Sequence, residues 1–281
     1  MGRVVREDVF TLDEAIELLD DEHKPDTGDL ASELETPSTT WDLNTPFSEA
    51  RELARYGWED KAEEIQEYFA EVERLLDNHY ETRLDVTGEA VDIGAYLDGE
   101  PECMFSYTVP EVKSANFLIA INGLCDVDAR TMMNRGIAIA ALLYSLQSQG
   151  ITTRLSIVTA VSSEPRGGGS EHHTEIEINQ YGEYIDPGKL AFWLAHPAAF
   201  RRCIFRYREQ CPDSIRQKFG YMQSEGYSSS KDLSDYQIEK RDCVYLPVIT
   251  SAQHDRYETP EKAFKTVKKM LKEQGFDLFK E

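Results

Sequence analysis

Two apolar stretches separated by a long helical segment decide the fold of this chain. Residues 115–123 read ANFLIAING and residues 150–160 read GITTRLSIVTA, and both have the composition of buried strands. Between them a helix is predicted over 126–149, with Asp126 or Asp128 as its cap and an apolar middle. A strand, a helix and a second strand form the right-handed crossover of a parallel sheet. The sequence therefore predicts an α/β protein with a Rossmann-like, mostly parallel sheet.

The C-terminal half supplies further elements of the same domain. A glycine-rich loop without a helix precedes the strand predicted over 172–179, so we expect that strand to be antiparallel and at or near an edge of the sheet. Downstream we expect helical pieces on either side of His196-Pro197, a polar excursion over 211–240 with at most a short helix, a strand over 243–249 and a last helix over 260–274.

The first hundred residues have a mainly helical and acidic pattern, in contrast to the α/β pattern of the rest of the chain. A capping box at Thr11 and Glu14 opens a short amphipathic helix over 11–21. The predicted parts are residues 1–40 (short helix plus flexible acidic linker), 41–100 (acidic helical hairpin extension) and 101–281 (α/β domain). The hairpin consists of helices over 45–57, with Thr45 as N-cap, and 59–77, and a strand and a short helix are expected within 83–100.

Charge is concentrated in that first part. Residues 1–100 hold 29 Asp and Glu against 8 Lys and Arg, which gives −21 of the total formal charge of −22. Such a surface repels phosphate backbones, so nucleic-acid binding through it is not expected. We expect instead that the acidic N-terminal third contacts a protein partner, or serves only as a solvated surface.

Cysteine usage and hydropathy indicate a soluble, intracellular protein. The five cysteines are widely spaced and form no CxxC pair, so we expect reduced thiols rather than disulfides or a structural zinc site. No run approaches the roughly 18 apolar residues of a membrane span, and the N-terminus lacks the apolar region of a signal peptide. We expect a cytoplasmic location and no membrane contact, while the oligomeric state is left open.

The element order over residues 115–276 resembles a von Willebrand A-type domain. In that family the first strand ends in a DxSxS motif that holds a divalent metal ion. Here Asn122 and Leu124 stand at its first Asp and first Ser, and Asp126 alone keeps an oxygen ligand. The resemblance implies the fold with a lost metal motif, because a hard cation needs several oxygen ligands.

Other motifs are similar to an uncharacterised family of bacteriophage proteins. They are Gly57-Trp58, GEAVDIGAYLDGEPECM (Gly88–Met104), Asn134-Arg135-Gly136, Ala195-His196-Pro197 with Arg201-Arg202, and Thr259-Pro260-Glu261. This resemblance implies a phage or prophage origin, and hence the host cytoplasm, but no activity.

One strand has the composition of a metal site. His173, Glu175 and Glu177 would share one face of the strand over 172–179, and His172 would lie on the other. A histidine with two carboxylates can bind zinc or manganese, and His172, His173 and Glu175 would then serve a metal-dependent hydrolase or nuclease. The favoured alternative is the charged outer face of an edge strand, which discourages aggregation.

A second candidate site is the carboxyl edge of the parallel strands, where open α/β sheets bind ligands. The residues expected at this rim are Asn122, Cys125, Asp126, Asp128, Ser251, His254 and Asp255. Cys125 and His254 would meet there as a nucleophile and its base. A capping aspartate, a buried cysteine and solvated loop residues explain the same sequence, and we favour that interpretation.

Three functions remain open at this point. The preferred hypothesis is a non-enzymatic protein-interaction module without a cofactor. The alternatives are the metal-dependent hydrolase or nuclease, which would require a divalent metal ion, and a structural or assembly protein of a virion.

Overall fold

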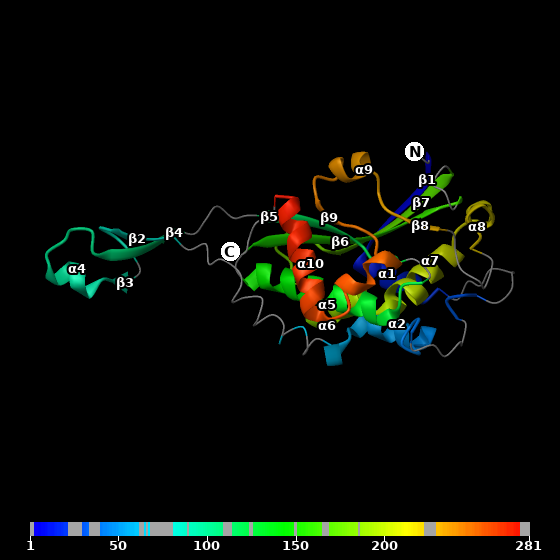
Figure 1. The fold of residues 1–281 in the computed structure, drawn as a ribbon, viewed down its shortest axis with the longest axis horizontal. Coiled ribbons are helices and arrows are strands. Elements are labelled where there is room, and N and C mark those ends of the chain that lie inside the picture. The colour runs from blue at the N-terminus through cyan, green and yellow to red at the C-terminus, as the bar shows by residue number, and fades with distance from the viewer. Residues whose placement is uncertain are drawn as a thin grey trace.

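The structure is a computed structural model of the 281-residue chain. It describes residues 3–21, 30–33, 40–61, 65, 67, 81–88, 90–108, 114–123, 126–148, 151–164, 169–184, 186–221 and 229–275. Most of them form one α/β body, and residues 81–108 form a separate small sheet (Figure 1).

The central sheet of the body is mainly parallel, as predicted. Its strands are β1 (Arg3–Thr11), β5 (Ser114–Ala120), β6 (Thr152–Ser162), β7 (Ser170–Asn179), β8 (Ser229–Lys231) and β9 (Val244–Leu246). The strand order is β1-β7-β6-β5-β9, and β8 pairs with the end of β6. Strands β6 and β9 flank β5 in parallel, whereas β7 runs antiparallel to β6. The predicted strand–helix–strand crossover is therefore present as β5, α5 (Ala129–Ser148) and β6.

Helices cover the two faces of this sheet unequally. They are α1 (Leu12–Leu18), α2 (Phe47–Tyr56), α5 (Ala129–Ser148), α6 (Pro187–Ala195), the π-helix η1 (Ala199–Ile204), α7 (Phe205–Glu209), α8 (Asp213–Phe219), α9 (Asp235–Glu239), the 3₁₀-helix η2 (Ser251–Arg256) and α10 (Pro260–Glu273). Figure 1 shows α5, α6 and α10 on one side of the sheet and α9 on the other. Along β5, Phe117 and Ile119 enter the large helix-covered core, while Leu118 and Ala120 enter the small core under α9. This alternation is the expected period of a strand that is buried on both faces.

The first strand was not predicted, and it lies beside β7 at the edge of the sheet. Strand β1 pairs in parallel with β7, with Asp8 opposite Thr174 in the register. The prediction that β7 is antiparallel, here to β6, and lies at or near an edge is confirmed, because β1 forms the edge and β7 is the strand next to it. Four charged residues interrupt the apolar ones along RVVREDVFT and hide the strand from a search for apolar runs, and most of the strand is exposed.

The described helix boundaries agree with most of the predicted signals. Thr11 and Glu14 form the capping box of α1, and Asp128 accepts the Thr131 amide at the start of α5. Helix α6 ends at Ala195, before His196-Pro197. The cap predicted for α2 is wrong, because the N-cap residue is Pro46 rather than Thr45. The helix predicted over 59–77 lies largely outside the described residues.

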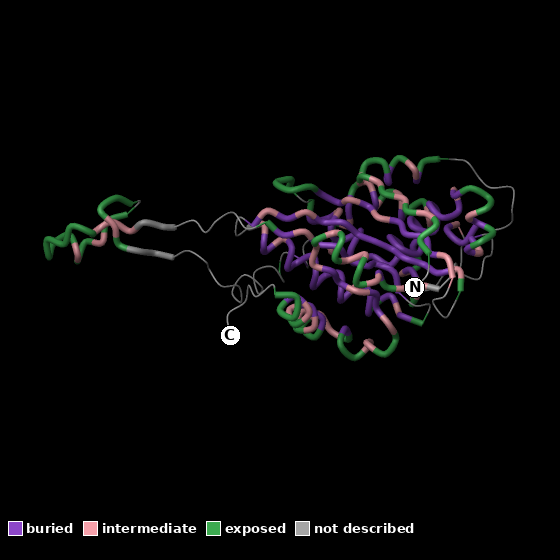
Figure 2. The backbone as a smooth tube through the Cα atoms, turned by 90° about the horizontal axis from the view of Figure 1, so that it is seen from above, coloured by how far each residue is buried: buried purple, intermediate pink, exposed green. Residues whose placement is uncertain are grey.

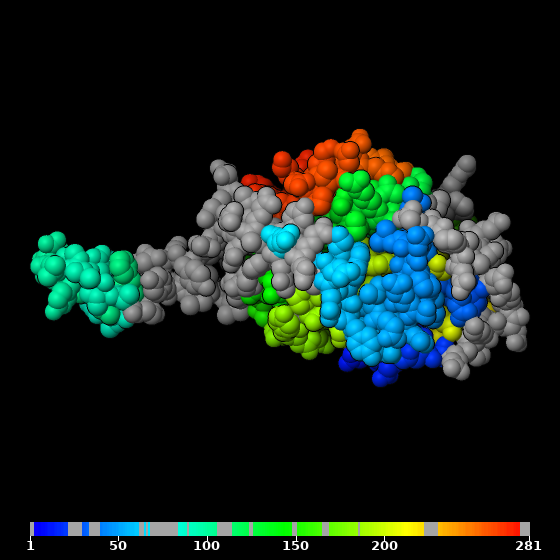
Figure 3. All heavy atoms as spheres, turned by 90° about the horizontal axis from the view of Figure 1, so that it is seen from below, coloured from blue at the N-terminus to red at the C-terminus, as the bar shows by residue number. Residues whose placement is uncertain are grey.

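The small sheet holds the strand and short helix expected within 83–100. It consists of β2 (Glu81–Asp85), β3 (Ala90–Val91), α4 (Ile93–Leu97) and β4 (Met104–Thr108), with antiparallel order β2-β4-β3. Asp92 caps α4 by accepting the Gly94 and Ala95 amides. The sheet stands clear of the body in Figures 1 and 3. Figure 2 shows no buried segment among the parts of it that are coloured for burial.

Candidate functional sites

The rim at the carboxyl ends of the parallel strands brings together only part of the predicted set. The His254 Nδ1 atom lies 3.9 Å from Asp128 Oδ2, and both side chains are partly exposed. Asp128 is also occupied as the cap of α5. Asp126, Ser251 and Asp255 are exposed, and Cys125 lies outside the described residues.

Asn122 lies beneath this rim rather than on it. It is fully buried, and its Nδ2 donates to the Ala160 carbonyl at 3.1 Å, which ties the end of β5 to β6. Next to it, the Gly123 carbonyl accepts the Ser230 hydroxyl at 3.0 Å. The amide of Asn122 therefore holds two strands together at the end of β5.

On the α9 side of β7, the predicted metal residues pair with other partners. His173 Nε2 lies 3.2 Å from Glu171, which Lys231 also contacts. Glu175 accepts from Arg241 at 3.3 Å and Glu177 from Arg154 at 2.7 Å. The ligand atoms of His173, Glu175 and Glu177 are thus not gathered at one point in the structure. They belong to a covered layer of ion pairs instead of the exposed edge that the sequence suggested.

The electrostatics of this layer follow from its burial. Burial alone would raise the pKa of Glu171, but the Lys231 ammonium outweighs it and the pKa is lowered. Burial lowers the pKa of His173, which disfavours the charged imidazolium even though Glu171 is adjacent. The layer is therefore a carboxylate held by a lysine beside a neutral histidine.

On the opposite face of β7, His172 forms a second buried cluster. Its Nε2 lies 2.9 Å from Asp8 Oδ2, and its Nδ1 lies 2.9 Å from the Tyr221 hydroxyl. Arg6 donates to the same Asp8 oxygen at 2.6 Å. Cys211 completes the group, because its sulfur and the ligand atoms of Asp8 and His172 all lie within 4.8 Å of one another.

Burial also controls protonation in this second cluster. It lowers the pKa of His172 and raises the pKa of the Cys211 thiol to about 11, so the sulfur is a thiol at neutral pH. Burial would raise the pKa of Asp8, but hydrogen bonds from His172 and Arg6 lower it. The arrangement is an ionised carboxylate, a neutral imidazole and a protonated thiol, without an activated nucleophile.

Sequence reasoning singled out His172 but missed Asp8, Tyr221 and Cys211. Asp8 belongs to the unpredicted edge strand, and Tyr221 follows α8 within the segment interpreted as a polar excursion. No spacing in the sequence links these residues. Only the pairing of β1 with β7 brings Asp8 to His172.

Several motifs quoted for the family resemblance meet at one packing junction. The Trp58 amide donates to the Gly188 carbonyl at 2.8 Å, and the Trp58 ring packs edge-on against the His196 ring at 4.4 Å between centroids. A Cβ on Gly136 would lie 2.2 Å from the Ala195 Cα, so α5 and α6 approach too closely for any side chain there. These residues are explained by close packing rather than by chemistry.

The arginines after His196 hold the acidic N-terminal segment onto the body. Buried Arg202 pairs with fully buried Asp42 and donates to the Ser32 carbonyl, while Arg206 pairs with Glu33. Glu209 in turn accepts the Ser32 amide at 2.9 Å. These direct contacts make Arg202 and Arg206 an anchor for acidic residues of the N-terminal segment.

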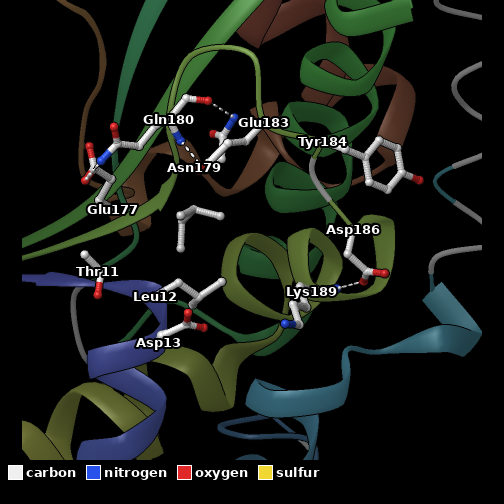
Figure 4. A pocket seen from close by; sticks show the side chains of 11 residues that line it. Thr11, Leu12, Asp13, Glu177, Asn179, Gln180, Glu183, Tyr184, Asp186 and Lys189 are labelled. Atoms are coloured by element: carbon white, nitrogen blue, oxygen red, sulfur yellow. Dashed lines mark hydrogen bonds between the residues drawn. The ribbon is translucent and has the colours of Figure 1, made fainter.

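A cleft of about 440 Å³ lies between the β1–α1 junction, the end of β7 and the start of α6 (Figure 4). It is rich in acids, and three of these have structural partners. Glu177 pairs with Arg154, Glu183 accepts the Gln180 amide, and Asp186 caps α6 through the Lys189 amide. Nothing in its lining forms a catalytic arrangement.

The cysteines and helices of the described part agree with two general expectations. Cys103, Cys203, Cys211 and Cys243 are free thiols. None of the helices that the structure describes has the length and apolar character that crossing a bilayer requires.

Fold and sites together define a mixed α/β protein with a mainly parallel, Rossmann-like central sheet and a small antiparallel sheet beside it. Comparison of the sequence with family models adds that residues 8–278 match the family described as "Domain of unknown function (DUF7192)". The chain belongs to this uncharacterised family. No curated protein and no solved structure matches it.

Proposed function

We propose that this protein is a non-enzymatic interaction module, and that it binds a protein partner through the small sheet of residues 81–108. The observation that carries the proposal is the apolar surface of this sheet. Ile93, Tyr96 and Leu97 of α4 are 71, 65 and 76% exposed, and Val86 and Val91 are also exposed. Apolar side chains gathered on one small unit are typical of a surface that a partner covers.

The residues of the small sheet whose burial is described form no core of their own. None of its residues with a described burial state is buried, and α4 contains no buried residue. Short strands without a hydrophobic core do not offset the entropy of ordering, which is about 1–2 kcal/mol for each residue. Contact with a partner would supply the missing burial.

Charge indicates which kind of partner fits. Residues 81–108 contain seven acids and one arginine, a net charge of −6, within a chain of −22. A second copy of the chain would bring like charge to the contact, which is unfavourable. The proposed occupant is therefore a protein surface with an apolar centre and a basic rim. This agrees with the acidic N-terminal third as the contact region.

The rest of the proposal concerns the body. The strand–helix–strand–strand order of β5, α5, β6 and β7 supports a von Willebrand A-like scaffold, and buried Asn122 supports a lost metal motif. An enzymatic role for His173 and Glu175 is less favoured because Glu171 and Arg241 engage them. A phage or prophage origin and a cytoplasmic location rest on the sequence motifs.

The test replaces the apolar residues of α4 and measures partner capture. The full chain and the triple variant Ile93→Ser, Tyr96→Ser, Leu97→Ser are immobilised and incubated with lysate of the source cells. Captured proteins are quantified by mass spectrometry. We expect a protein that the native chain retains and the triple variant loses by more than about tenfold, because exposed anchors carry most of a contact's free energy.

The matched control changes equally exposed side chains on the body. Tyr56 on α2 and Tyr236 on α9 are each 67% exposed, and Tyr56→Ser with Tyr236→Ser should retain the captured protein. Urea unfolding should be the same for all three proteins. Equal capture by both variants would contradict the proposal. Light scattering that shows a dimer lost only in the α4 variant would assign the surface to a second copy instead.

A further inference from the structure

The strongest unassigned group in the molecule is the set of Asp8, His172 and Cys211. They come from β1, β7 and the chain just after α7, so the fold and not a local motif assembles them. Among the residues that the structure describes, no other three His, Cys, Asp or Glu ligand atoms lie within 4.8 Å of one another.

The imidazole of His172 is oriented as in a metal site. Its Nδ1 is hydrogen-bonded to the hydroxyl of Tyr221, a residue only 1% exposed. Because Nε2–H donates to the ionised Asp8 carboxylate, Nδ1 of the neutral ring accepts from the Tyr221 hydroxyl; a metal ion on Nε2 selects the other tautomer, in which Nδ1–H donates to Tyr221. Such a hydrogen bond on the far ring nitrogen fixes the tautomer and the ring plane of ligating histidines.

We propose that Asp8, His172 and Cys211 bind a zinc ion through a carboxylate oxygen, Nε2 and the sulfur. A nitrogen, oxygen and sulfur set suits a borderline-soft ion, whereas magnesium and calcium take oxygen ligands. The 2.9 Å between His172 Nε2 and Asp8 Oδ2 is close to the roughly 3.3 Å that separates two such ligands around tetrahedral zinc. Three protein ligands leave a fourth position for water.

The charge balance of the step is simple. Binding releases the proton of the Cys211 thiol to solvent, and the thiolate and the Asp8 carboxylate then offset the two charges of the ion. Arg6 keeps its hydrogen bond to Asp8 and holds the carboxylate in place. His172 and Cys211 are buried, while the Asp8 side chain is 17% exposed, so an ion reaches the site from the edge formed by β1.

The test uses the full purified chain and cobalt as a spectroscopic substitute for zinc. After removal of metal by a chelator, one equivalent of Co²⁺ should give the absorption of a thiolate-to-cobalt charge transfer. Added Zn²⁺ should abolish it and raise the midpoint of thermal unfolding. Cys211→Ser should lose the band, and Cys103→Ser, on the small sheet, should keep it.

A second variant covers the case in which Cys211→Ser does not fold. Asp8→Asn, on the edge strand, should keep the fold and weaken cobalt binding by at least about tenfold. The proposal is overturned if no stoichiometric cobalt or zinc binds, or if the bound metal gives the same spectrum and affinity in folded variants at these positions. The latter result would mean an adventitious ion only.

Discussion

The sharpest energetic prediction concerns His196, which lies between α6 and η1 and is 5% exposed. Its Nδ1 accepts the Ala198 amide at 3.1 Å, and its ring contacts Trp58 and Phe192. Burial lowers the pKa of His196 from the usual 6.5 to about 4. The folded protein therefore excludes a proton that the unfolded chain binds.

The sign and size of the effect follow from this difference. The contribution to stability is complete above the unfolded pKa near 6.5 and is lost as the pH falls toward about 4, since only the unfolded state gains the proton in that window. At about 1.4 kcal/mol per unit, the full loss is about 3 kcal/mol, and about 2 kcal/mol of it falls between pH 7 and pH 5.

The assay is urea unfolding of the native chain and of His196→Asn at pH 7 and at pH 5. The amide oxygen of asparagine can still accept the Ala198 amide but does not titrate. Carboxylates, His172 and His173 contribute equally to both proteins, so the difference between the two pH dependences isolates His196. The free energy of unfolding of the native chain should fall by about 2 kcal/mol more than that of the variant. Parallel pH dependences would refute the reasoning.

Three further predictions test the packing and the anchors by urea unfolding. A Gly→Ala substitution usually stabilises a helix by about 1 kcal/mol. Gly136→Ala should instead destabilise the protein by about 2–3 kcal/mol, because its Cβ would meet Ala195. A gain in stability would contradict the packing argument. Arg202→Met should lower the free energy of unfolding by about 3–5 kcal/mol, because it leaves Asp42 buried without its cation. Adding Asp42→Asn should restore part of this loss. Additive effects of the two substitutions on stability would count against the ion pair. Thr11→Ala should cost about 1 kcal/mol through the lost cap, and an unchanged midpoint would argue against that contribution.

The sequence was sufficient to predict the elements of the fold where hydrophobic periodicity and local signals such as helix caps agree. The crossover from β5 through α5 to β6 has continuous apolar strands and a capping aspartate at Asp128, so its type and direction could be predicted. Strand β1 could not be predicted, because four charged residues leave this edge strand without a continuous apolar run. With β1 as the edge strand, β7 is the second strand of the sheet, which is within the predicted position at or near an edge.

The same missing strand explains the failure at the candidate sites. Face alternation along β7 correctly separated His172 from His173, but it could not name the partners on each face. The partner of His172 is Asp8, which comes from β1. The partner of His173 is Glu171, which lies near the start of β7 itself and is held by Lys231 from β8. Long-range pairing, not local composition, determines which ligand atoms meet.

The sequence motifs quoted for the family resemblance can be sorted by burial, and this sorting bears on function. Gly136 and His196 lie at a packed junction, and Arg202 forms an ion pair with a buried aspartate. Packing and ion pairing within the body therefore account for these residues. The longest motif, Gly88–Met104, differs, because none of its residues with a described burial state is buried. Core packing gives no reason for Ile93, Tyr96 and Leu97 to be apolar there. A surface contact does, and for this reason the search for function should begin at the small sheet rather than at the rim of the large one.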